Sequence, residues 1–343
     1  AAGLGLAWAT RRWGPGLLTV SVLAGLFGGG TLRLSGAHVQ TQPGIVLRLV
    51  AVPFSQSEKI DPRTSVDIVN AYLTEGLGPG LADVTHLVWP EGAVNGLAIE
   101  DEPLLRAMGS LLVQVDDTPP VWLMNSLRME IAPNRRGEPR RRFYNSAVAV
   151  EFDALGNPAV AATNDKRKLV PFGEFIPGGE PVERLGARLV STALGSITPA
   201  PEKRIALFPG LPPISPQICY EVIFPGLTPA GDARTGPPQA ILNQSNDAWF
   251  GATLGPDQHA AIARYRAIEE GLPLIRSAAN GISGVFDSFG RAERVLDGKS
   301  TAHLDALLPL PVGKSVSMRR INAYLLLFVL ALTAITSLGF RRG

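Results

Sequence analysis

The sequence has 343 residues, which is enough for one large domain or two domains of ordinary size. Only 18% of the residues are charged and 45% are hydrophobic, and the mean hydropathy is +0.15, a balance that indicates that part of the chain contacts lipid. The net charge of +2 gives no sign of a nucleic-acid partner. The single cysteine excludes an internal disulfide.

Residues 1–43 are predicted to form a partial membrane segment and a linker. An apolar run, 1–9, and two arginines precede a second apolar run, 17–27, which leads into three glycines and is short for a membrane helix of about 20 residues. A signal peptide is the main alternative, because a basic pair precedes an apolar core, and a buried helix is another. We favour the end of a membrane region, because the apolar opening does not resemble the basic start of a signal peptide. The first residue is Ala1 rather than methionine, as in a fragment of a longer protein.

Between residues 44 and 313, short apolar runs alternate with amphipathic stretches and turns, which predicts an α/β domain whose sheets are covered by helices. The expected strands are 44–52, 85–89, 120–124, 146–152, 214–219, 239–244, 274–277 and 284–287. The expected helices are 61–77, 102–112 and 256–270.

Residues 314–343 are predicted to contain a transmembrane helix. No charged residue occurs from Asn322 to Phe340, and a pair of arginines flanks each end of this run. A buried core helix is the alternative. Because basic residues stand at both ends, the positive-inside rule gives no orientation.

Three segments place reactive side chains close to apolar runs, where loops often carry catalytic groups. Glu91 follows a Trp-Pro turn, Lys166 and Lys168 lie in a basic segment, and Cys219 ends an expected strand. Each alone has an ordinary explanation, since loop carboxylates and lysines are commonly solvated and a lone cysteine is commonly buried. Together, the carboxylate would accept the thiol proton, and an ammonium would lower the thiol pKa and stabilise an oxyanion. The backbone N–H after Cys219 would be a second oxyanion donor.

Several motifs give residues 44–313 a resemblance to a known family. They are Trp89-Pro90-Glu91, Tyr144-Asn145-Ser146, Asp165-Lys166, Lys168 to Glu174, Ile218 to Glu221, Ser245 to Gly251, Gly255-Pro256 with Gln258-His259, Arg264 with Arg266-Ala267 and Glu269, and Asn280-Gly281-Ile282. With them the chain resembles the nitrilase, or carbon–nitrogen hydrolase, superfamily, and within it the apolipoprotein N-acyltransferase family. The resemblance implies a nitrilase-like four-layer αββα sandwich.

The resemblance also implies a Glu-Lys-Cys triad, in which Glu91 is the general base, Lys166 the oxyanion-stabilising cation and Cys219 the nucleophile. Glu174 would be the additional active-site carboxylate of the superfamily. By composition Lys168 competes for the role of the lysine, but the motif spacing to Glu174 favours Lys166.

Other residues have weaker assignments. The resemblance implies that Tyr220 and Glu221 line the acyl site beside the nucleophile. Trp249 and Phe250 would either contact the acyl chain or the membrane, or pack under a turn. The basic stretch Arg135–Arg142 fits a solvated hairpin tip better than a contact with anionic lipid headgroups.

The implied reaction takes an acyl chain from a phospholipid onto the cysteine as a thioester and passes it to the free α-amino group of a diacylglyceryl-cysteine lipoprotein. It requires no metal or organic cofactor, and the four histidines, His38, His86, His259 and His303, lack ligand spacing. The expected protein is a monomer in the bacterial inner membrane, multi-pass when intact, with its domain on the periplasmic face. A membrane-tethered amidase that hydrolyses a small amide is the alternative enzyme, and an inactive nitrilase-like binding module is the alternative class.

Three departures from the family pattern stand out. The family usually carries several transmembrane helices ahead of the domain, and this chain has at most the end of them. A tyrosine commonly stands where this chain has Asn164, and no tryptophan is present in Gln56–Ile60 after the first domain strand. The triad residues are unaffected, but acyl-chain specificity is left open.

Overall fold

The structure is a computed structural model that describes residues 2–11, 13–115, 118–133, 137–178, 196–202 and 205–313. The chain divides into two compact units, Ala1–Gln40 and Thr41–Gly343. The transmembrane helix predicted within residues 314–343 lies outside the described residues.

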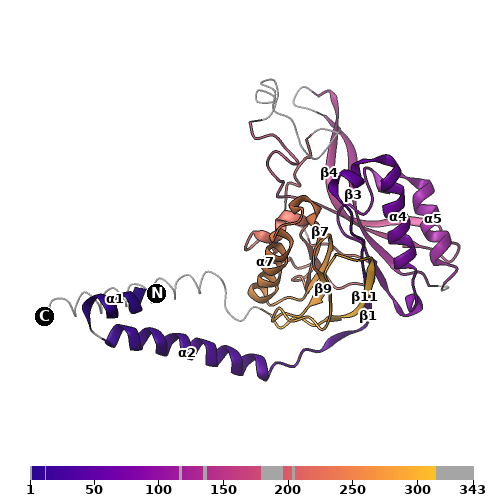
Figure 1. Ribbon diagram of the computed structural model, residues 1–343. Coiled ribbons are helices and arrows are strands. Elements are labelled where there is room, and N and C mark those ends of the chain that lie inside the picture. The colour runs from indigo at the N-terminus through magenta and orange to yellow at the C-terminus, as the bar shows by residue number, and fades with distance from the viewer. Residues whose placement is uncertain are drawn as a thin grey trace. The chain divides into compact units, whose positions relative to one another are not determined.

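The N-terminal unit contains two apolar helices, α1 (Ala2–Thr10) and α2 (Gly14–Ser35) (Figure 1). Pro15 lies in the first turn of α2, where its missing N–H removes no helical hydrogen bond. The helix continues through the three glycines, so the apolar segment is longer than the run 17–27 suggested. Of the helices that the structure describes, α2 alone has the length and composition to cross a membrane, and a signal sequence has the same properties.

Two sheets form the second unit. The first has six strands in the order β11-β1-β2-β3-β4-β5, and the second has five in the order β10-β9-β8-β7-β6. Strands β1, β2 and β3 are parallel, as are β6, β7 and β8, so the carboxyl ends of each trio lie at one edge of its sheet. The strands are β1 (Thr41–Ala51), β2 (His86–Val88), β3 (Val121–Pro133), β4 (Pro139–Phe152), β5 (Pro158–Asp165), β6 (Ile214–Pro216), β7 (Ala240–Asn246), β8 (Leu274–Ala279), β9 (Ser283–Phe286), β10 (Val295–Leu296) and β11 (Ala302–Pro309). The helices are α3 (Gln56–Ile60), α4 (Pro62–Gly76), α5 (Glu102–Leu112) and α7 (Gly255–Glu270).

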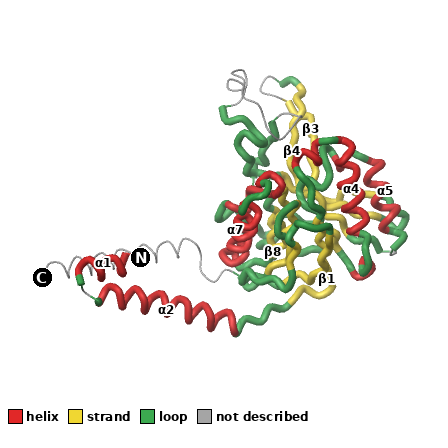
Figure 2. Tube along the Cα trace, in the orientation of Figure 1, coloured by secondary structure: helices red, strands yellow, loops and turns green. Residues whose placement is uncertain are grey.

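Helices cover the outer face of each sheet (Figures 1 and 2). Helices α4 and α5 share a hydrophobic core with the first sheet, in which Met108 and Trp122 are fully buried. Helix α7 shares another core with the second sheet, through Ala267 and Leu274. A third core, which includes Leu123, lies between the two sheets. The layers therefore follow the order helix, sheet, sheet, helix, and the α/β class is confirmed.

Side chains alternate between the two faces of the strands. In β3, Trp122 and Met124 belong to the core under the helices, whereas Leu123 belongs to the core between the sheets. Strands that are buried on both faces appear in the sequence as continuous apolar runs. This is why the buried strands could be predicted. Every strand and helix expected between residues 44 and 313 is present, α5 has the predicted bounds, and the others have shifted ends.

The basic stretch Arg135–Arg142 is only partly a loop. Strand β4 begins at Pro139, so its last three arginines are strand residues. Arg142 lies opposite Glu130 on β3, a cross-strand pair of opposite charge that supports the extended hairpin. Residues 134–136 lie outside the described residues, and contact of this stretch with lipid stays a prediction.

Candidate active site

Cys219 lies on a sharp turn between β6 and the short 3-10 helix η3 (Cys219–Ile223). Its φ is +48°, a left-handed conformation that is uncommon outside glycine and that often marks backbone held for function. The residue is half-buried. The turn follows the carboxyl end of a parallel strand, the edge at which α/β sheets commonly place their sites.

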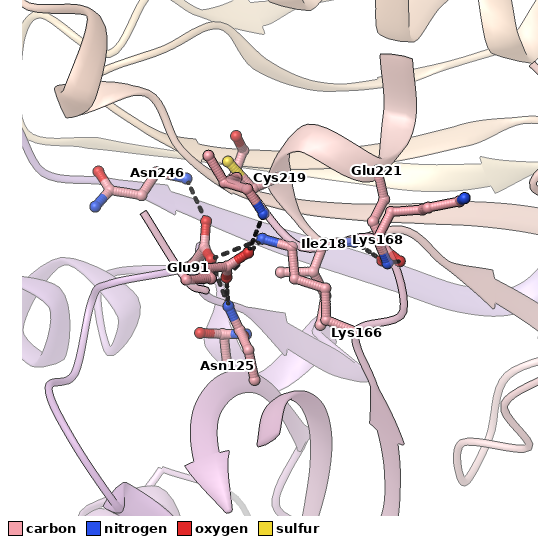
Figure 3. Close-up of polar contacts among 12 residues, drawn as sticks. Glu91, Asn125, Lys166, Lys168, Ile218, Cys219, Glu221 and Asn246 are labelled. Carbon is pink, nitrogen blue, oxygen red and sulfur yellow. Dashed lines mark hydrogen bonds and ion pairs between the residues drawn. The ribbon is translucent and has the colours of Figure 1, made fainter. Parts of the chain in front are cut away.

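Glu91 follows β2, at the carboxyl end of a parallel strand in the first sheet, and points toward the cysteine turn (Figure 3). Its Oε1 accepts a hydrogen bond from Nδ2 of Asn145 at 2.8 Å, and its Oε2 accepts one from the backbone N–H of Asn246 at 3.1 Å. The carboxylate also lies beside the side chain of Cys219, since each of the two groups shifts the pKa of the other. Glu91 is thereby held within reach of the thiol proton.

Lys166 follows β5, and its side chain is only 1% exposed. Its Nζ lies 3.8 Å from Oε1 of Glu91 and donates a hydrogen bond of 2.9 Å to Oε1 of Glu174. Asn145 joins the two carboxylates, because its Nδ2 donates to Glu174 at 3.0 Å as well as to Glu91. Nδ2 of Asn125 donates to Oδ1 of Asn145 at 2.7 Å, so the amide can present only its N–H groups to the carboxylates.

The position of the two candidate lysines decides between them. Lys166 reaches both carboxylates, whereas Lys168 is exposed and its Nζ lies 5.8 Å from the ring centroid of Phe224. The geometry therefore favours Lys166 as the active-site cation.

Glu221 ties the lysine segment to the cysteine turn. Its Oε1 accepts hydrogen bonds from the backbone N–H groups of Arg167 at 2.8 Å and Lys168 at 2.9 Å, and its Oε2 accepts one from Ile218 at 2.9 Å. Burial raises the pKa of Glu221, although these N–H groups and Lys166 act in the opposite direction. These contacts join the lysine segment to the cysteine turn, and the expected place of Glu221 beside the acyl chain stays a prediction.

Three aromatic residues, Tyr220, Trp249 and Phe250, were assigned possible acyl contacts from the sequence. Tyr220 is half-buried and packs edge to face on Phe224, with ring centroids 4.9 Å apart. Trp249 and Phe250 belong to the 3-10 helix η4 (Asp247–Phe250), which follows β7, and are 43% and 40% exposed. Their exposure leaves them able to meet a chain or a membrane, and their acyl contacts stay predictions.

A buried polar network supports the nucleophile from the second sheet. Ser245 lies beside the side chain of Cys219, and its Oγ donates to Oδ1 of Asp247 at 2.6 Å. Asp247 is in turn paired with Arg276 at 2.6 Å and with Nδ1 of His259 at 2.9 Å. Since all of these partners are buried, the carboxyl end of β7 is held in one position behind the thiol.

Burial and partners together set the protonation states of the cluster. Burial alone would raise the pKa of Glu91 and lower that of Lys166. Their mutual attraction, with help from Asn145 and Glu174, outweighs burial, so the pKa of Glu91 is lowered and that of Lys166 is raised. Both groups are charged near neutral pH.

The pKa of the Cys219 thiol shifts in the direction that favours its neutral form. Burial, together with the adjacent carboxylate of Glu91, raises the pKa of Cys219 to about 12, although Lys166 opposes the shift. The lowered thiol pKa predicted from the sequence was therefore wrong, because loss of water and the neighbouring negative charge outweigh the ammonium. The resting pair is a neutral thiol beside a carboxylate.

Alkylation of Cys219 without substrate is expected to accelerate from about pH 7 to beyond about pH 10, because the thiolate forms only as the pH approaches about 12. Near neutral pH, iodoacetamide should react about tenfold or more slowly than with an unhindered thiol. The measurement is the rate of mass gain on the peptide that contains Cys219. The same protein in urea is the control, and a rate plateau below about pH 8 in the folded protein would contradict the assignment.

A family model described as carbon-nitrogen hydrolase matches residues 123–303, more than half of the sequence. The chain belongs to the carbon–nitrogen hydrolase family. It is similar to proteins named apolipoprotein N-acyltransferase: 33% identical over 316 residues to that of Rhodopseudomonas palustris, 34% over 313 to that of Bradyrhizobium diazoefficiens and 37% over 302 to that of Caulobacter vibrioides.

These alignments cover 90%, 90% and 84% of this carbon–nitrogen hydrolase chain, but 56%, 56% and 53% of the relatives. The chain thus spans about half the length of the curated relatives that it matches. A crystal structure of a carbon-nitrogen hydrolase from Helicobacter pylori matches with a TM-score of 0.48 and 14% identity, covering 77% of this chain and 89% of that chain.

Three residues near the candidate catalytic groups were given no role from the sequence. Asn145 was part of a family motif, but its bridge between two carboxylates depends on strand pairing that a motif does not reveal. Asn125 had a weak signal, since an amide directly follows an apolar strand run. Lys59 had none, because it comes from a separate segment after β1.

Proposed function

We propose that this chain is the catalytic part of an apolipoprotein N-acyltransferase that moves an acyl chain from a phospholipid to the N-terminal amino group of a diacylglyceryl-cysteine lipoprotein. The observation that carries the proposal is the meeting of Glu91, Lys166 and Cys219 in one buried cluster. The names of the relatives support this choice among the reactions of a carbon–nitrogen hydrolase.

In the first half-reaction, the sulfur of Cys219 attacks the ester carbonyl of the phospholipid while Glu91 takes the thiol proton. This order suits a thiol with a pKa of about 12, because negative charge develops on sulfur only as the new bond forms. Nζ of Lys166 and the backbone N–H of Tyr220 stabilise the tetrahedral oxyanion. Its collapse expels the lysophospholipid alkoxide, which takes the proton from Glu91 and leaves a thioester.

In the second half-reaction, the free α-amine of the lipoprotein attacks the thioester carbonyl. Glu91 accepts the amine proton, the thiolate of Cys219 leaves, and Glu91 returns the proton to sulfur. A site at the bilayer surface that excludes water favours aminolysis over hydrolysis. Trp249 and Phe250, both partly exposed, are suitable apolar contacts for the acyl chain or for the membrane.

The proposed setting is the bacterial inner membrane, with this domain on the periplasmic face and the enzyme acting as a monomer. The apolar helix α2 and the apolar run of residues 322–340 would hold the domain where both substrates lie. The intact protein is proposed to be multi-pass, as the greater length of its relatives suggests.

The test is a reaction in mixed micelles that contain a phospholipid with a labelled acyl chain and a synthetic diacylglyceryl-cysteine peptide. The expected product is the peptide carrying the labelled chain in amide linkage to its α-amino nitrogen. The Cys219→Ala variant should form none, and the matched variant Lys168→Met should retain activity within about threefold, since its ammonium lies away from the cluster.

Two outcomes would count against the proposal. Ammonia release from small amides without acylation of the peptide would instead indicate the membrane-tethered amidase. Acylation that persists in Cys219→Ala would contradict the thioester route.

A further inference from the structure

Lys59 is a lysine near the catalytic groups that the proposed mechanism does not use. It lies in α3, directly after β1, and a capping box fixes the start of this helix, with Ser55 N–H donating to Glu58 at 2.6 Å. The backbone carbonyl of Lys59 accepts a hydrogen bond of 2.6 Å from Nδ2 of Asn95. This bond ties α3 to the loop that follows Glu91.

The side chain of Lys59 reaches inward to the backbone next to the general base. A Cβ on Gly92, the residue after Glu91, would overlap Nζ of Lys59, and Nδ2 of Asn246 lies 3.1 Å from the same point. Asn246 also binds Glu91 through its backbone N–H. The φ of Gly92 is +85°, a backbone conformation that favours glycine, and this glycine leaves the space that the ammonium occupies.

The ammonium of Lys59 acts on the reacting groups through its charge. Burial lowers the pKa of Lys59, and the nearby Glu91 and Cys219 oppose that shift. In return, Lys59 is one of the groups that lower the pKa of Glu91. Among the described residues, Nζ is seen in no hydrogen bond or salt bridge, which leaves its N–H groups available for charge that develops during reaction.

The charges of the groups around Glu91 indicate a role for the ammonium of Lys59. Glu91 and Glu174 carry two negative charges, and Lys166, which contacts both, supplies one positive charge. Without Lys59 the group would hold a net negative charge before any develops on sulfur. Two other carboxylates near Cys219 are already satisfied, since Asp247 is paired with Arg276 and Glu221 accepts three backbone N–H bonds.

We propose that Lys59 is a second active-site cation, which balances the charge of Glu91 and stabilises negative charge on the sulfur of Cys219 as it attacks. In this proposal Lys166 stabilises the oxyanion, and Lys59 stabilises the negative charge on the sulfur and on the carboxylate of Glu91. This inference rests on the proposed role of Cys219 as the nucleophile.

The test compares two alkylating agents of similar size on the detergent-solubilised full chain. Iodoacetate is anionic and iodoacetamide is neutral, so the ratio of their rate constants at Cys219 reports the local positive potential, while access to the thiol affects both. Lys59→Met is expected to lower this ratio about tenfold, because a unit charge near the sulfur is lost in a partly desolvated site. Lys59→Arg should keep the ratio within about threefold of the parent value, since it keeps the charge.

The control is Lys168→Met, which removes an exposed lysine of the neighbouring segment and should leave the ratio unchanged. A ratio that is the same in Lys59→Met as in the parent, with Cys219 still reactive, would overturn the inference and leave the proposed function standing. A slowing of both reagents to the same degree would also overturn it, since that result indicates a packing role. If Cys219 reacts with neither reagent in the parent, even at alkaline pH, the nucleophile itself is wrong, and the proposed function fails with the inference.

Discussion

Replacing Glu91 with glutamine is expected to slow acyl transfer from phospholipid to Cys219 by about a thousandfold. The amide cannot take the thiol proton. Loss of the carboxylate removes one cause of the raised thiol pKa, but burial, the larger cause, remains and still disfavours the thiolate near neutral pH. The measurement is the single-turnover rate of thioester formation. Because glutamine preserves shape and can still hydrogen-bond, the thermal unfolding temperature should change little.

The control for this variant is Glu102→Gln, which removes an exposed carboxylate on α5 and should leave the rate unchanged. The rate of Glu91→Gln should increase with pH over the alkaline range, since hydroxide ion then supplies the missing thiolate. A variant that forms thioester at more than about a tenth of the parent rate near pH 7 would show that another group is the base.

Replacing Asn145 with leucine is expected to slow thioester formation by about a hundredfold, which is the usual cost of misplacing a catalytic group by about 1 Å. Asn145 donates hydrogen bonds to both Glu91 and Glu174. Without these two N–H donors, the two carboxylates compete for the ammonium of Lys166 and shift from their positions. Loss of the buried amide also removes one of the two acceptors of Nδ2 of Asn125 and leaves only the backbone carbonyl of Ser146. The rate is measured as for Glu91→Gln.

The variant Asn145→Asp separates charge from geometry. A third carboxylate next to Glu91 raises the pKa of Glu91, so more of the base is protonated near pH 7 and the rate should rise with pH as that proton is lost. Asn145→Leu adds no charge and should show no such new dependence. Asn70→Leu, on the exposed face of α4, is the control. Equal pH profiles for the two Asn145 variants would contradict the bridging role.

The sequence predicted the fold well where strands are buried on both faces. Strand β3 begins as predicted because Trp122 and Leu123 face two different cores, which makes the run apolar throughout. Three strands, β5, β10 and β11, were not predicted from the sequence. Strands β5 and β11 are the two edge strands of the first sheet and contain both exposed and less exposed residues, so neither forms a continuous buried apolar run and their assignment depends on pairing with β4 and β1.

Prediction of the site was limited by contacts across the two sheets. Motifs identified Glu91, Lys166 and Cys219. The apolar pattern predicted the strands beside Glu91 and Cys219, whereas Lys166 follows β5, which the pattern did not predict, and was assigned from its motif alone. Sequence alone overestimated the influence of the ammonium on the thiol, because the burial of the thiol and the nearby carboxylate of Glu91 exist only in the folded chain. The position of Lys59 near Glu91 could not be predicted from the sequence either, since α3 and the loop after β2 meet only once the sheet has formed.

The most direct test of this account is the mass of the Cys219 peptide after the protein is incubated with phospholipid in the absence of any acceptor. The expected result is a gain of one acyl group on Cys219, which neutral hydroxylamine removes as expected for a thioester, and which is absent in Glu91→Gln over the same time. Consumption of phospholipid without an adduct, or an acyl group carried by a residue other than Cys219, would contradict it.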